Sequence, residues 1–143
     1  MKKAYSNKWV GSSKPRKQRK YLANAPIHKK RKFLSVNLIK ALREKYSTRN
    51  IVVRKGDKVK IMRGKFKGKE GKVTKVLIKL QKIYIEGIQT KKQDGSMVDV
   101  PVRSSNLQII ELNLDDKKRF KSITTKTPKK ETKPINKEGE KTE

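Results

Sequence analysis

The 143-residue sequence has no cysteine and a single histidine, His28. Without thiols there can be no disulfide framework and no thiolate zinc site. His28 lies in a basic segment with no carboxylate nearby to orient it, which argues against base catalysis. No apolar run approaches the roughly 20 residues of a membrane-spanning helix. The positively charged N-terminus is not followed by the apolar region of a secretory signal. These absences predict a soluble, intracellular protein.

Acidic residues are also scarce, and the first along the chain is Glu44. Only 13 Asp and Glu accompany 41 Lys and Arg, which gives a formal charge of +28. Such a charge repels itself, so a polyanion is the simplest partner that could hold the chain compact. Nucleic acid is the first candidate, and an anionic membrane surface is the second. The acids of the central region are scattered through turns and strand ends, without a pair or a metal cluster. They are Asp57, Glu70, Glu86, Asp94 and Asp99.

Hydrophobic residues make up 32% of the chain, too few for a core along its whole length. One small domain with basic extensions is the organisation that fits. We expect a basic arm at 1–34, a short helix and connection at 35–50, and a folded β domain at 51–113. A short helical turn at 114–122 and a disordered, Pro/Lys/Glu-rich tail at 123–143 complete the chain.

The N-terminal arm carries two charge blocks, KPRKQRK (14–20) and HKKRK (28–32). Blocks of this kind are typical of disordered tails or nucleic-acid-binding arms. A nuclear-localisation signal would not need two blocks with aromatic residues between them. Trp9, Tyr21 and Phe33 could stack on exposed bases or pin the arm to the domain. We favour pinning for Phe33, and both roles stay open for Trp9.

A short helix is expected from Ser35, as its N-cap, to about Tyr46. Leu38, Leu42 and Tyr46 recur at four-residue spacing, and Ile39 widens this apolar stripe. A helix of this length is not stable alone. We therefore expect it to dock on the protein's own core rather than on a partner.

The stretch from 56 to 87, GDKVKIMRGKFKGKEGKVTKVLIKLQKIYIEG, organises the β domain. Val59 and Ile61 alternate with lysines, as in a half-buried strand. The following loop holds three glycines, which let a backbone approach a ligand closely. These are Gly64, Gly68 and Gly71, and the loop cations are Arg63, Lys65, Lys67 and Lys69. Taken alone, the pattern fits a phosphate cradle and a solvated basic hairpin equally well.

Further strands follow along the chain. The run 72–80 loses clean alternation, which indicates a bulge, and Ile83 and Ile85 alternate with polar neighbours. Asp94-Gly95 is a strong hairpin signal. Pro101 restricts the next strand, with its alternating valines, to an edge or bulge position. A last strand is expected at 107–112.

The stretch 56–87 resembles a KOW motif, and residues 54–112 resemble large-subunit ribosomal protein twenty-four, called twenty-six in eukaryotes. The matching segments are RKGDKVKIMRGKFKGKEGKV, IYIEGIQTKKQDG and SNLQIIEL, preceded by an extension similar to that of archaeal and eukaryotic members. The resemblance covers about residues 14–120. It implies a small SH3-like barrel within a mainly β fold. The compact loop 64–71 points to an archaeal type, whereas Arg103-Ser104 departs from the expected His-Pro.

The resemblance implies a structural constituent of the large ribosomal subunit in the cytoplasm, not an enzyme. Such members bind the 5′ region of large-subunit ribosomal RNA early in assembly, near the nascent-peptide exit tunnel. The implied partners are this RNA and neighbouring ribosomal proteins, without membrane insertion or homo-oligomerisation. No cofactor is implied, and Mg²⁺ enters only as part of the RNA environment. The implied RNA-contacting residues are Arg16, Lys17, Arg19, Lys20, His28, Lys29, Lys30, Arg31, Lys32, Arg63, Lys65, Lys67, Lys69 and Lys72.

Three rival functions fit less well. A metal-dependent nuclease lacks clustered carboxylates. A reader of modified tails needs converging aromatic side chains, and the domain offers only Phe66 and Tyr84, far apart in sequence. A KOW-containing transcription elongation factor usually joins the motif to other domains, for which this chain leaves no room.

Overall fold

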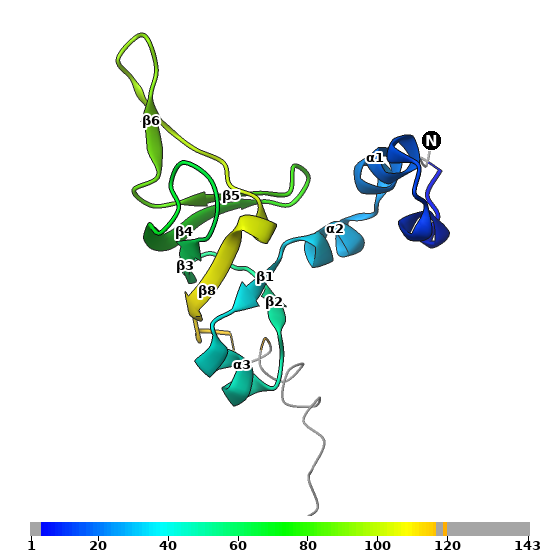
Figure 1. Cartoon of the computed structure of the whole chain (residues 1–143), viewed down its shortest axis with the longest axis horizontal. Helices are drawn as coiled ribbons and strands as arrows, with labels where there is room; N and C mark the ends of the chain where they lie inside the picture. The colour runs from blue at the N-terminus through cyan, green and yellow to red at the C-terminus, as the bar shows by residue number, and fades with distance from the viewer. Residues whose placement is uncertain (1–3, 117–118, 120–143) are drawn as a thin grey trace, which may run out of the picture.

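The computed structural model describes residues 4–116 and 119, and it is mainly β with short helices (Figure 1). The helical elements are η1 (Asn7–Gly11), α1 (Pro15–Asn24), α2 (Ile27–Phe33), α3 (Lys40–Tyr46) and η2 (Ser104–Asn106). The strands are β1 (Ser35–Leu38), β2 (Asn50–Val52), β3 (Lys58–Ile61), β4 (Glu70–Leu77), β5 (Lys82–Ile85), β6 (Gln89–Lys91), β7 (Met97–Asp99) and β8 (Leu107–Glu111).

Six strands form one mixed sheet in the order β2-β1-β8-β3-β4-β5. β1 runs parallel to β8, and the other neighbouring strands are antiparallel. β2 and β5 are the two end strands and do not pair with each other within the described residues, so the sheet is not a closed barrel. The β6–β7 hairpin projects from the sheet (Figure 1).

The core consists of aliphatic side chains on one face of the curved sheet. Val59 and Ile61 on β3 and Ile83 and Ile85 on β5 are buried, as their alternation predicts. The same cluster includes Val36 and Leu38 on β1 and Leu107 and Ile109 on β8. The hydrophobic face of each short strand is therefore covered by its neighbours across the core, a burial that strands this short need for stability.

The helix predicted from Ser35 is wrong in its first turn, because Ser35–Leu38 forms β1. Val36 and Leu38 are buried and Asn37 is exposed, which is the two-residue period of a strand. The Ser35 hydroxyl donates to the Lys32 carbonyl oxygen (2.8 Å) at the end of α2 instead of capping a new helix. The helix begins at Lys40, and Leu42 packs against the core. Docking on the protein's own core is thus confirmed.

The predicted irregularities of the β domain are confirmed. The β4–β5 register shifts between Val73 and Lys75, where a bulge was expected. β6 and β7 pair around a turn in which Gly95 has φ +87°. The strand before Pro101 ends at Asp99, and Val102 makes only an isolated bridge to Ile83. The turn at Arg103-Ser104 is the start of η2, a short 3-10 helix.

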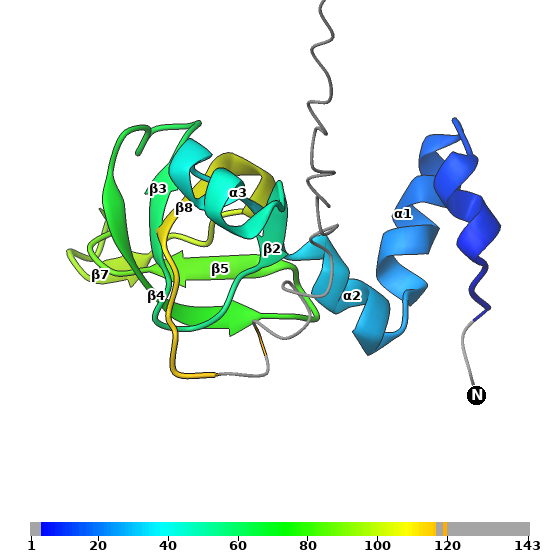
Figure 2. The ribbon, with the colours of Figure 1, turned by 90° about the horizontal axis from the view of Figure 1, so that it is seen from below.

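The basic arm contains η1, α1 and α2, and it extends away from the sheet on the side of β1 and β2 (Figures 1 and 2). Proline residues mark the helix starts: Pro15 is the first residue of α1, and Pro26 is the N-cap of α2. Ala25 between the helices is extended, as expected before a proline. None of the helices within the described part of the chain has the length and apolar character to cross a membrane. Most of the predicted helical turn 114–122 and the whole tail 123–143 lie outside the described residues.

Candidate nucleic-acid interface

The loop between β3 and β4 is a tight turn closed by main-chain hydrogen bonds. The Lys67 amide donates to the Gly64 carbonyl (3.0 Å), and the Gly68 amide donates to the Ile61 carbonyl (2.8 Å). Gly64 and Gly68 have φ +96° and +89°, which side chains with a Cβ rarely adopt. The loop is therefore shaped by its own backbone, and its charged side chains are left free to point outward.

The loop cations are exposed, and no acid among the described residues pairs with them. Lys69 lies over the ring of half-buried Phe66, with 5.5 Å from Nζ to the ring centroid. No ion pair to an acid within residues 4–116 and 119 involves a predicted loop cation. Arg63, Lys65, Lys67, Lys69 and Lys72 are all exposed. The structure thus concentrates unneutralised positive charge at this end of the β3–β4 pair.

Gly71 has a different role from the other two glycines. It lies within β4, where a Cβ would come within 2.6 Å of the Glu86 carbonyl oxygen and 2.8 Å of an Ile85 methyl group. Its φ is not in the positive region. A glycine is therefore required at position 71 because β5 approaches β4 closely there. Gly71 does not shape the loop between β3 and β4.

An aromatic cluster holds the arm together. Tyr21 on α1 stacks on Tyr5 with centroids 5.5 Å apart, and it also contacts Phe33 on α2 at 5.5 Å. Trp9 packs edge-on against Tyr5, and Lys20 lies 5.3 Å over the Trp9 ring. These side chains pack on one another, so they hold η1, α1 and α2 together. The Phe33 ring thus contacts Tyr21 within the arm, and the main-chain carbonyl of Phe33 connects the arm to the domain by accepting from the Ser104 hydroxyl (2.9 Å).

Gln18 adds a polar clamp to this cluster. Its side-chain amide donates to the carbonyl oxygens of Trp9, Val10 and Ser12 at 3.2, 3.0 and 2.6 Å. The Trp9 carbonyl also accepts from the Ser12 amide (3.1 Å), and the carbonyls of Val10 and Ser12 lie at the end of η1, where helices leave backbone acceptors to be satisfied by side chains. Gln18 lies among the α1 cations, and sequence analysis did not single it out. The one sequence signal for Gln18 is its position three residues before Tyr21, which places both side chains on the same face of the helix.

The predicted arm cations lie mostly on the outside of the two helices. Lys29 and Lys30 are half-buried, and the Lys30 ammonium donates to the Ala23 carbonyl (3.0 Å) between the helices. None of these residues forms an ion pair with an acid that the structure describes. The exposed members are Arg16, Lys17, Arg19, Lys20, His28, Arg31 and Lys32.

The arm and the loop form two separate basic surfaces. The arm projects from the β1–β2 side of the sheet, and the β3–β4 pair lies toward the opposite side in both views (Figures 1 and 2). One compact anion would not contact both surfaces. A long polyanion could contact both, and so could two neighbouring double helices.

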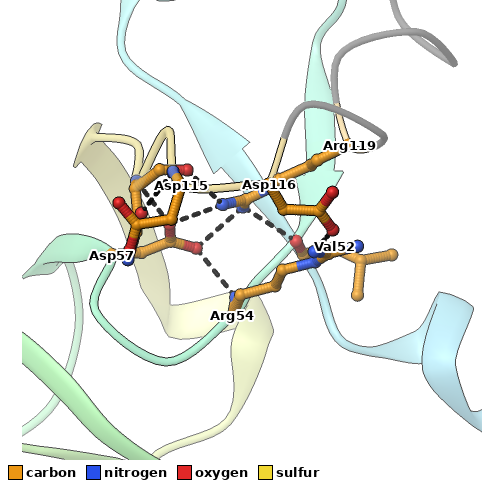
Figure 3. A network of polar contacts seen from close by, with 7 residues as sticks. Val52, Arg54, Asp57, Asp115, Asp116 and Arg119 are labelled. Carbon is orange, nitrogen blue, oxygen red and sulfur yellow. Dashed lines mark hydrogen bonds and ion pairs between the residues drawn. The ribbon is translucent and has the colours of Figure 1, made fainter.

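A buried ion pair supports the domain behind these surfaces (Figure 3). The Arg119 guanidinium donates to both carboxylate oxygens of Asp57 (2.7 and 2.8 Å), and it also donates to the Val52 carbonyl (3.1 Å). The Asp57 carboxylate also accepts from the backbone amides of Arg54 (2.8 Å) and Asn113 (3.0 Å). Asp57 is completely buried, and Arg119 is 5% exposed. Sequence analysis placed Asp57 among the scattered acids of turns and strand ends, because nothing in one sequence pairs it with a cation 62 residues away.

Within the described residues, no group of three or more His, Cys, Asp or Glu side chains is arranged to hold a metal ion. The arrangement is one of exposed cations on a hydrogen-bonded scaffold, which suits contact with phosphates. A family model that describes the eukaryotic ribosomal proteins L26 and the archaeal ribosomal proteins of the L24 type matches residues 12–126, most of the chain.

Proposed function

The chain belongs to the ribosomal protein family called L26 in eukaryotes and L24 in archaea, and we propose that it binds large-subunit ribosomal RNA through two basic surfaces. Its family makes it a structural constituent of the large subunit in the cytoplasmic ribosome and not an enzyme. Ribosomal RNA and other ribosomal proteins are its partners. The single observation that supports the proposed surfaces is that both the loop and the arm carry exposed cations to which no acid in the described part of the chain pairs.

The loop between β3 and β4 would contact phosphates. Its positive-φ glycines keep the turn compact, and Lys65 and Lys67 are exposed next to them. Lysine supplies a point charge without base specificity, so these contacts would fix position and not sequence. Recognition would rest on the shape of the RNA, which is how most double-stranded RNA is bound.

The arm would act as a preshaped element with a basic outer surface. The aromatic cluster and the Gln18 clamp already fix η1, α1 and α2 relative to one another. Arg16, Arg19 and Arg31 can bond phosphates bidentately. An element that is ordered before binding loses less conformational entropy than a disordered tail that folds on the RNA.

The family resemblance supplies the finer proposals. We assign β3 and β4 to a KOW motif within an SH3-like arrangement, of the archaeal type. Binding would occur at the 5′ region of the large-subunit RNA, early in assembly and near the exit of the nascent-peptide tunnel. The protein would act as a single copy, without a cofactor of its own.

The test is binding of the full-length protein to a transcript of the 5′ region, measured over a series of salt concentrations. If 6–10 phosphates are contacted, affinity should fall roughly a thousandfold or more between about 50 and 200 mM salt. Replacing Lys65 and Lys67 by Gln should reduce the slope of log affinity against log salt by about 0.7–0.9 per residue removed. The matched control replaces Lys91 and Lys92 on the projecting hairpin, also exposed, and should leave the slope unchanged. A flat salt response, or equal slopes for both pairs, would contradict the proposal.

A further inference from the structure

A groove of about 860 Å³ lies between β2 and the second half of β4, next to α2. Its lining includes the aliphatic side chains of Ile51, Val76 and Ile78, each half-buried. Exposed cations line it as well: Arg31 from α2, Lys55 after β2, and Lys75 on β4. The RNA-binding surfaces proposed above include Arg31 alone of these residues, so the groove itself has no assigned partner.

On the groove side of β2, no strand within the described residues pairs with its edge. The Leu38 amide donates to the Arg49 carbonyl, and the Val53 amide donates to the Leu34 carbonyl. In an antiparallel pair, residues alternate between facing the partner strand and facing away. Val52 must therefore direct its amide and carbonyl away from β1. The Val52 carbonyl already accepts from the Arg119 guanidinium, so the Val52 amide is the group of this residue that a guest strand would use.

The β4 side of the groove is an unpaired edge for a similar reason. β3 pairs with β4 as far as Lys72, and main-chain bonds continue to Val73. The Ile83 amide and carbonyl on β5 both bond to Val102, so they face away from β4. Because Val76 is opposite Ile83, it directs its own amide and carbonyl away from β5, toward the groove. Within the described residues, no strand pairs with either edge on this side.

We propose that this groove binds an extended, acidic segment of another protein, which adds as a strand beside β2 and β4. Unpaired edges recruit extended peptides by main-chain hydrogen bonding, and alternate side chains of the guest then enter the groove. Apolar guest residues would contact Ile51, Val76 and Ile78. Acidic residues would face Arg31, Lys55 and Lys75, none of which has an acidic partner within the described part of the chain.

Two other occupants fit the groove less well. RNA bases bind best on aromatic platforms, and the residues that line the groove include no aromatic side chain. The chain's own segment directly after Arg119, FKSITTKTPKK, contains lysines and no acid, so it matches the cationic rim poorly. Charge and backbone geometry together favour an acidic strand.

The test uses the isotope-labelled full-length protein and a short synthetic peptide of alternating valine and glutamate. Hydrogen exchange at the amides of Val52 and Val76 should slow when the peptide is added, because both amides face the groove. The amide of Ile51 faces β1 and is an internal reference. A valine–lysine peptide should have no effect. The proposal would be overturned if the exchange of these amides did not respond to the peptide, or if they were already protected without it. It would also be overturned if a uridine oligonucleotide slowed their exchange instead of the peptide.

Charge-reversal variants test the role of the cationic side chains that line the groove. Lys55→Glu with Lys75→Glu should weaken binding of the valine–glutamate peptide about tenfold or more. Lys91→Glu with Lys92→Glu makes the same change in net charge on the β6–β7 hairpin and should leave peptide binding intact. An equal loss in both pairs would show non-specific attraction and overturn the proposal. The peptide test does not depend on the RNA contacts, because binding to the 5′-region transcript is measured separately on the same proteins.

Discussion

Asp57 and Arg119 form a bidentate, buried ion pair between the entry to β3 and the segment that follows β8. Both carboxylate oxygens also accept a backbone amide, from Arg54 and Asn113. The carboxylate is thus fully hydrogen-bonded in a place where water does not reach it. Arg119 in turn bonds to the β2 carbonyl of Val52, so one guanidinium connects three parts of the chain.

Arg119→Ala should lower the free energy of unfolding by about 3–5 kcal/mol, because it leaves a buried carboxylate without its cation. Urea unfolding of the full-length protein measures the change. Arg54→Ala is the matched control, since Arg54 pairs with Asp116 while nearly half of its side chain is exposed. That variant should cost at most about 1 kcal/mol. Similar losses for both variants would contradict the special role of the buried pair.

Gly71→Ala should destabilise the sheet by about 1–3 kcal/mol, because the new methyl group would press on the Glu86 carbonyl and force β4 and β5 apart. Thermal or urea unfolding gives the difference. Gly11→Ala is the control: a Cβ there meets nothing within 4 Å, and the residue has no positive φ. We expect that change to stay within about 0.5 kcal/mol. Equal stability of the two alanine variants would show that β4 and β5 accommodate the extra methyl group, and it would contradict this prediction.

Tyr21→Ala should loosen the arm without unfolding the sheet, because Tyr21 joins Tyr5 to Phe33 within the arm. The helical circular dichroism signal should fall, and the affinity for RNA should fall with it, since the arm cations are no longer held in place. The urea midpoint of the sheet should change little. Leu22→Ala, at an exposed neighbouring position, is the control and should preserve the signal. An unchanged spectrum in Tyr21→Ala would show that the cluster does not organise the arm.

The hairpin turn predicts a specific pH response. The hydroxyl and the backbone amide of Ser96 donate to the Asp94 carboxylate (2.7 and 2.9 Å), and these bonds lower the pKa of Asp94. Because the pKa of Asp94 is lower in the folded state, these hydrogen bonds stabilise the turn at pH values above the unfolded-state pKa of about 3.9. This stabilisation is lost as the pH falls through the folded-state pKa. Ser96→Ala should move the pKa of Asp94 back toward its ordinary value, and Ser96→Thr should keep it low. Carboxyl-carbon titration by NMR distinguishes these outcomes, and identical titrations would contradict the assignment.

The sequence predicted the strands whose signal is local. Val59 with Ile61 and Ile83 with Ile85 alternate with polar residues, and all four side chains are buried. Asp94-Gly95 determines its hairpin through the conformational freedom of one glycine. In each case, the residues that determine the structure lie next to one another along the chain.

Features that depend on distant residues could not be predicted in this way. Leu38 is four residues before Leu42, a spacing that fits a helix, and pairing of β1 with both β2 and β8 makes Leu38 part of a strand. Arg119 carries no local signal for its partner Asp57. In the arm, the two charge blocks lie in α1 and α2, whose starts are marked by Pro15 and Pro26, and charge alone does not predict these helices. The exposed cations of the candidate site could be identified from charge alone, but their scaffold of Gln18 and aromatic contacts could not.

The parallel pairing of β1 with β8 has a consequence for the order of events during synthesis. Leu38 pairs with Ile109, about seventy residues later in the chain. At about 5–20 residues per second, the ribosome needs several seconds to make the intervening segment. The basic arm therefore leaves the translating ribosome well before its own sheet can be completed. During that interval the newborn chain exposes its basic arm without the domain to which it belongs, and nearby polyanions can capture it first.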